Sequence, residues 1–106
     1  RVRETSAKTF DKNIKKIIKI AKKYTNRIFF VGLTKVDKRA KDYEGTSFTN
    51  ERIIQFNEII KKNCKNITFI DMFDILNNND LDDGLHPNKK GYDKMYKIIK
   101  KRVLGW

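Results

Sequence analysis

The chain has a single histidine, His86, which lies in the segment 82–88 with the sequence D-D-G-L-H-P-N. A histidine that acts as a general base needs one ring nitrogen on its target and the other held by an acceptor that fixes the tautomer. Asp83, three residues earlier, can supply that acceptor. Gly84 allows a sharp turn, and Pro87 favours an extended backbone at His86. The spacing therefore predicts an Asp83–His86 pair suited to general base catalysis.

A second interpretation of this segment requires no catalysis. Asp83 and Gly84 are common turn formers, and His86 would then be an ordinary loop residue before a helix. A short D-x-x-H pattern also arises often by chance. The position of the segment favours the functional interpretation, because ligands of open α/β sheets bind at the carboxyl ends of the strands.

Three amphipathic helices are predicted around this segment, because apolar residues recur there every three or four positions. The first two helices are expected to end near Lys23 and Asn66. The expected caps are Thr5 or Ser6, Thr49 or Asn50, and Asn88. The expected inner face of the third helix carries Tyr92, Met95, Tyr96, Ile99, Val103 and Trp106.

Two short apolar runs, 28–33 and 67–73, are rich in β-forming residues and are predicted to be strands covered on both faces. The resulting order is α-β-α-β-α, which implies parallel pairing through right-handed crossovers. Two strands alone rarely make a stable sheet. We therefore infer that an upstream segment or another chain supplies further strands.

The polar segment 35–48 connects the first predicted strand to the second helix. Connections of this length are often binding loops. The segment leaves the same edge of the sheet as the His86 segment. We therefore expect it to border a substrate cleft, with Asp37 and Tyr43 as candidate contacts.

Several segments resemble blocks of the SGNH/GDSL hydrolase family. The most specific is D-G-L-H-P-N at 83–88, followed by Gly91 and Tyr92, which resembles the last motif block of that family. The segment 29–37 is similar to the family's strand leading into a G-L-T-P-V-D loop, with Lys35 in place of the usual proline. Weaker similarities cover the helix that starts near Thr49 and the strand at 69–73. The resemblance thus extends over nearly the whole chain.

The resemblance implies a flavodoxin-like α/β/α sandwich with a parallel sheet and hydrolysis of acyl esters, often of carbohydrates or lipids, without a cofactor. It implies that His86 is the general base of a Ser-His-Asp triad and that Asp83 orients it. The only serines are Ser6 and Ser47, and neither lies in a G-D-S context. We therefore interpret residues 1–106 as the C-terminal part of a single hydrolase domain. This part alone is expected to be inactive.

The formal net charge of +12 suggests an alternative function, a module that binds nucleic acid or another polyanion. Most of the 25 basic residues are lysines, and only six are arginines. Phosphate and base recognition favours arginine, whose planar fork bonds bidentately. Many lysines also fall on the expected outer faces of helices. A solvated basic surface is therefore the preferred interpretation of the charge.

Other classes of site and location are less well supported. Asp80, Asp82, Asp83 and His86 could ligate a metal, but their spacing does not match an EF-hand loop. The single Cys64 excludes an internal disulfide and a multi-cysteine zinc site, and it fits a reducing compartment such as the cytoplasm. No apolar run is long enough for a transmembrane helix.

Overall fold

The computed structural model describes residues 6–39 and 49–105. Three α-helices and two strands follow one another in the predicted order, so the expected mixed α/β class is confirmed. A short 3-10 helix precedes the last α-helix. The elements are α1 (Ala7–Lys22), β1 (Phe29–Val31), α2 (Asn50–Asn63), β2 (Thr68–Ile70), η2 (Asn78–Asp80) and α3 (Lys89–Leu104).

Each α-helix begins at a side chain that the sequence marks as a cap. Ser6 accepts a hydrogen bond from the Thr9 amide at the start of α1. The equivalent bonds at the other two starts join Thr49 to the Arg52 amide in α2 and Asn88 to the Gly91 amide in α3. These bonds satisfy backbone N–H groups that a helix leaves without a partner in its first turn.

The two strands form a parallel pair, as predicted, with Phe30 opposite Phe69 at its centre. Both strands are shorter than the apolar runs that predicted them. Gly32 still donates to the Ile70 carbonyl of β2, and the next residue, Leu33, bonds through its amide and carbonyl to the side chain of Asn57 in α2, at 2.7 and 2.9 Å. Two residues later the Lys35 amide donates to the Phe73 carbonyl at 3.2 Å, so the two segments stay side by side beyond the ends of the strands.

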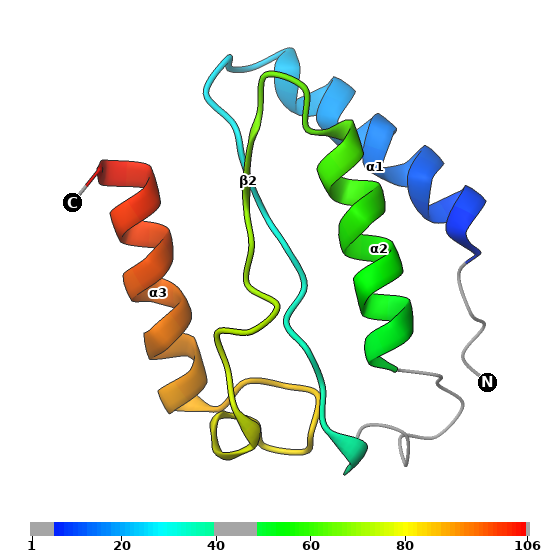
Figure 1. Cartoon of the computed structure of the whole chain (residues 1–106). Coiled ribbons are helices and arrows are strands. Elements are labelled where there is room, and N and C mark those ends of the chain that lie inside the picture. Colours follow the sequence, from blue (N-terminus) through cyan, green and yellow to red (C-terminus); the bar gives the residue numbers. More distant parts are fainter. Residues whose placement is uncertain (1–5, 40–48, 106) are drawn as a thin grey trace.

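Figure 1 shows both strands between α3 on one side and the pair of α1 and α2 on the other. The rings of Phe10 and Phe56 stack where α1 meets α2, with centroids 4.1 Å apart. Beneath them lies one buried cluster, made of Ile14, Ile18, Ile60 and Ile67. A second cluster lies under the loops that follow the strands, where Val36 and Ile53 pack with Phe73 and Leu85.

The predicted inner face of α3 is only partly buried. Met95 and Ile99 are half-buried, whereas Tyr92 and Tyr96 are 57% and 60% exposed, so the prediction that these tyrosines lie in a core is wrong for the described residues. Trp106 lies outside those residues. Both strands were predicted to be covered on both faces. All three residues of β1 are instead only half-buried. A sheet of two short strands offers α3 too little surface to cover its whole stripe.

No helix in ranges 6–39 and 49–105 combines the length and the hydropathy that a membrane span requires.

Candidate functional site

The segment between η2 and α3 forms a short closed turn that carries Asp83 and His86. The Asp82 amide donates to the His86 carbonyl at 2.8 Å, and Leu81 and Pro87 form an antiparallel bridge. Gly84 at the tip has a φ of 85°, which side-chain-bearing residues adopt only at a cost. The turn chemistry expected from the sequence is thus present.

Within this turn the two predicted site residues lie in contact. Nδ1 of His86 is 2.7 Å from Oδ2 of Asp83. The other carboxylate oxygen, Oδ1, accepts hydrogen bonds from the backbone amides of Leu85 and His86 at 2.9 and 2.8 Å. Backbone amides and the imidazole therefore fix the Asp83 carboxylate together, so its direction toward the ring is set locally.

This contact determines which ring nitrogen can work as a base. When Nδ1 carries the proton and donates it to an ionised Asp83, the lone pair of the neutral ring lies on Nε2. The same carboxylate stabilises the imidazolium that forms once Nε2 takes a proton. The pair is suited to general base catalysis, and the His86 side chain is 57% exposed and accessible.

An ion pair between a buried carboxylate and a partly exposed lysine attaches α3 to the start of this turn. The Asp80 side chain is fully buried, and its Oδ2 accepts from the Asn77 amide at 2.9 Å and from Lys94 Nζ of α3 at 2.6 Å. The Asn77 amide and Lys94 together hold the pKa of Asp80 below its ordinary value. Gly91 approaches so closely that an added Cβ would overlap the Asp80 carbonyl oxygen. Asp80 thus anchors the helix that follows the site.

The loop after β1 reaches the same turn from the other side. Arg39 donates to the carbonyls of Asn78, Leu81 and Asp82, and it forms an ion pair with Asp37 at 2.6 Å. The hydrogen bonds between Asp37 and Arg39 lower the pKa of the Asp37 carboxyl and raise the pKa of the Arg39 guanidinium. Asp37 was a predicted cleft residue, whereas Arg39 was not singled out from the sequence. Tyr43, the other predicted cleft residue, lies outside the described residues.

The sequence model of the GDSL-like lipase/acylhydrolase family matches residues 2–94, a range that includes both strands and the Asp83–His86 turn. The chain belongs to this family.

One curated relative is a multidomain esterase from Ruminococcus flavefaciens, which is 36% identical to the chain over 64 residues. The match covers 55% of this chain and 8% of that protein. No solved structure matches the chain. The family assignment supports the hydrolase interpretation. Because the match covers only a small part of the esterase, the activity of the whole protein remains a proposal.

The described structure does not place a serine beside His86 as a nucleophile. Ser6 caps α1 and bonds to Thr9 at 2.9 Å, and Ser47 lies outside the described residues. The alternative of a metal site gains no support, because ranges 6–39 and 49–105 contain no group of three His, Cys, Asp or Glu side chains suited to hold an ion. Asp80, one of its four candidate ligands, is instead paired with Lys94.

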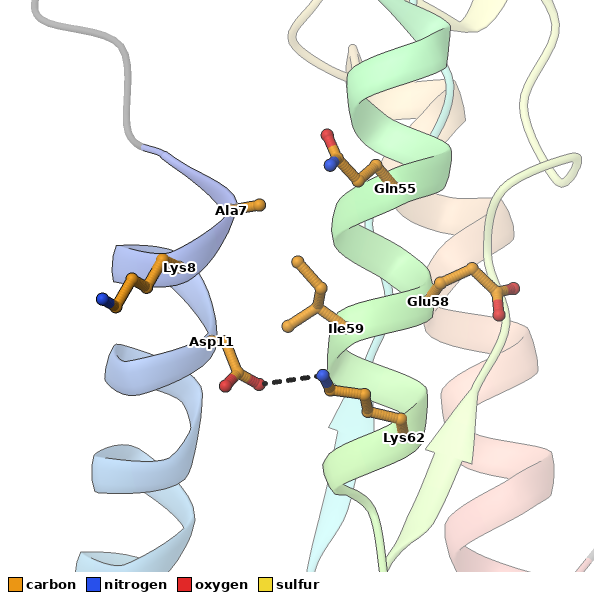
Figure 2. Close-up of a pocket in the computed structure, with 7 residues that line it drawn as sticks. All are labelled: Ala7, Lys8, Asp11, Gln55, Glu58, Ile59 and Lys62. Atoms are coloured by element: carbon orange, nitrogen blue, oxygen red, sulfur yellow. Dashed lines mark ion pairs between the residues drawn. The ribbon is translucent and has the colours of Figure 1, made fainter.

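Two grooves lie outside the Asp83–His86 turn. Figure 2 shows one of about 630 Å³ between α1 and α2, across which Asp11 and Lys62 form an ion pair at 3.7 Å. Its lining mixes apolar side chains with charges of both signs. A smaller groove of about 330 Å³ is mostly apolar and lies between α1 and β1. Neither of these two grooves includes a residue of segment 82–88.

Proposed function

We propose that the chain is the C-terminal part of a serine acyl-ester hydrolase domain of the SGNH type. In this proposal His86 is the general base and Asp83 orients it. The observation that carries the proposal is the 2.7 Å contact between the two side chains, in a turn that lies inside the range matched by the family. A geometry of this kind is what a Ser-His-Asp triad requires of its last two members.

The proposed reaction divides acyl transfer into two steps. Nε2 of His86 removes the proton of a serine hydroxyl as its oxygen attacks the acyl carbon of the ester. The imidazolium then protonates the departing alkoxide, which leaves an acyl-enzyme. In the second step His86 activates water in the same way, and the acid is released. Acyl esters of carbohydrates or lipids are the proposed substrates.

The nucleophile and the oxyanion donors are proposed to lie in an upstream segment or in another chain, which also completes the sheet. Half-buried side chains along β1 support this part of the proposal, as does the presence of only two strands among the described residues. A base without a nucleophile or oxyanion donors has little means of catalysing acyl transfer. Residues 1–106 alone are therefore proposed to be inactive.

A hydrolysis assay of the full-length protein that contains this chain tests the proposal. We expect turnover of a small aryl acetate and none of the corresponding aryl phosphate, because the proposed site is built for acyl transfer. An isolated 1–106 chain is the matched control and should give no turnover. Absence of activity toward every acyl ester tried, or equal activity in the isolated chain, would contradict the proposal.

The contacts of the arginines favour the hydrolase proposal over the alternative of a polyanion-binding module. Arg27 donates to the Val103 carbonyl at 2.6 Å, Arg39 bonds within the loops, and Arg52 lies over the Phe56 ring. These guanidinium groups are engaged inside the chain. Oligonucleotide binding that weakens steeply with added salt would favour the alternative.

A further inference from the structure

Arg39 makes a set of contacts that converge on the backbone of the candidate site. Its guanidinium donates to three carbonyl oxygens, those of Asn78, Leu81 and Asp82, at 3.1, 3.4 and 3.3 Å. Asp82 is also the residue whose amide bonds to the His86 carbonyl. The Arg39 side chain thus bonds to the backbone of Leu81 and Asp82, the residues that lead into the Asp83–His86 turn.

Asp37 fixes Arg39 and also contacts the turn directly. Both oxygens of its carboxylate accept hydrogen bonds from Arg39, at distances from 2.6 to 3.1 Å, and its side chain is only 6% exposed. The backbone amide of Asp37 donates to the carbonyl of Gly84 at the tip, at 2.9 Å. Asp37 is therefore occupied inside the loops, which leaves its carboxylate poorly placed to bind a substrate.

These contacts matter because they hold the backbone of the Asp83–His86 turn, in addition to the packing of Leu85 against Val36 and Ile53. The turn's own hydrogen bonds fix Asp83 against His86, but they do not fix the pair relative to the sheet. General base catalysis requires Nε2 to stay within hydrogen-bond reach of the hydroxyl it deprotonates. A displacement of about 1 Å can lower a rate about 100-fold. A link from the turn to the loop after β1 limits such displacement.

We propose that Asp37 and Arg39 act as a pair of positioning residues. They hold the His86 turn where Nε2 of His86 can reach the hydroxyl that it deprotonates. The inference rests on the proposed hydrolase function and adds to it two residues that do not touch the substrate. It predicts a loss in kcat with little change in KM, since the pair sets the geometry of the base and leaves substrate binding intact.

Kinetics of the Arg39→Ala variant in the full-length protein test the inference. We expect kcat for an aryl acetate to fall about 10- to 100-fold, with KM within about twofold of the wild type. Arg39→Lys should recover part of the loss, because an ammonium can still pair with Asp37 but cannot span three carbonyls. The control is Lys97→Ala in α3, which removes an exposed ion pair to Asp93 at 3.9 Å and should leave kcat unchanged.

A second measurement does not depend on catalysis. Amide hydrogen exchange reports whether the turn opens, and the amides of Asp82, Leu85 and His86 are the reporters because each bonds within the turn. Arg39→Ala should speed their exchange at least about tenfold relative to amides of α1. Asp37→Asn, which keeps the size of the side chain, should act in the same direction and serves if Arg39→Ala does not fold.

The outcomes separate this inference from the proposed function. If His86→Ala abolishes activity while Arg39→Ala and Asp37→Asn leave kcat and turn exchange unchanged, the positioning role is overturned and the hydrolase proposal stands. If His86→Ala retains full activity, the proposed function fails instead. Faster exchange in the turn together with a selective loss of kcat supports both.

Discussion

Oδ2 of Asp83 and Nδ1 of His86 lie 2.7 Å apart, and the second oxygen of the same carboxylate accepts two backbone amides of the turn. These contacts join residues within the four consecutive positions 83–86. The orientation of the imidazole is therefore a local property of the turn. We propose that the position of the turn relative to the sheet depends on Asp37 and Arg39.

The Asp83→Asn substitution should disable the base while keeping the shape of the turn. The substituted side chain would offer an amide that can donate to Nδ1 of His86, which moves the ring proton to Nε2 and removes the lone pair the reaction uses. We expect kcat of the full-length protein to fall about 10³- to 10⁴-fold. The exposed neighbour Asp82→Asn is the control, and a similar loss there would contradict the assignment.

Gly84→Ala should affect both stability and activity. Gly84 has a φ of 85°, and a left-handed conformation costs an alanine about 1–2 kcal/mol. Gly105→Ala is a matched control, because Gly105 has a φ of 75° after the end of α3 and an added Cβ there meets nothing within 4 Å. Urea unfolding should show a loss in both variants, whereas kcat should fall in Gly84→Ala alone. Equal kcat values in both variants would contradict a role for the turn geometry.

The contact between α1 and α2 should weaken in acid. Hydrogen bonds from Lys15 and Asn63 lower the pKa of Asp11 from 3.8 to about 2. Because the folded pKa is the lower one, ionised Asp11 stabilises the fold above pH 3.8, and this stabilisation is lost as the pH falls toward 2. Asp11→Asn should therefore lower the urea midpoint near neutral pH, and the difference from the wild type should disappear as the pH falls through about 2.

The control for this pH dependence is Asp93→Asn, which removes a 68% exposed carboxylate 3.9 Å from Lys97. Pairs this exposed contribute little to stability. Asp93→Asn should leave the urea midpoint nearly unchanged near neutral pH. A constant difference between Asp11→Asn and the wild type across the whole pH range would rule out the proposed contribution of Asp11.

The helices could be predicted closely from the sequence, because their starts depend on local signals. Ser6, Thr49 and Asn88 cap them by bonding to amides three residues ahead. The strand ends could not be predicted as well. The regular ladder ends at Val31 and Ile70, although single backbone bonds from Gly32 to Ile70 and from Lys35 to Phe73 continue beyond it. The burial of Tyr92 and Tyr96 was overestimated, because a periodic stripe predicts an inner face and does not reveal how much sheet is available to cover it.

The part of the candidate site formed by residues close in sequence could be predicted. Asp83 and His86 are three residues apart, so the turn alone brings them together. Arg39 could not be recognised, since its partners near the turn are backbone carbonyls about 40 residues away, and carbonyls have no sequence signature. Asp80 was considered only as a metal ligand. The N-N-N-D sequence at 77–80 does contain the capping box that Asn77 and Asp80 form.

The most direct test of the account is the turnover of His86→Ala in the full-length protein, measured with a small aryl acetate beside the wild type and Asp82→Asn. If Nε2 of His86 is the general base, kcat should fall at least about 10³-fold while the unfolding midpoint stays close to that of the wild type. Retention of kcat within about tenfold of the wild type would contradict the account.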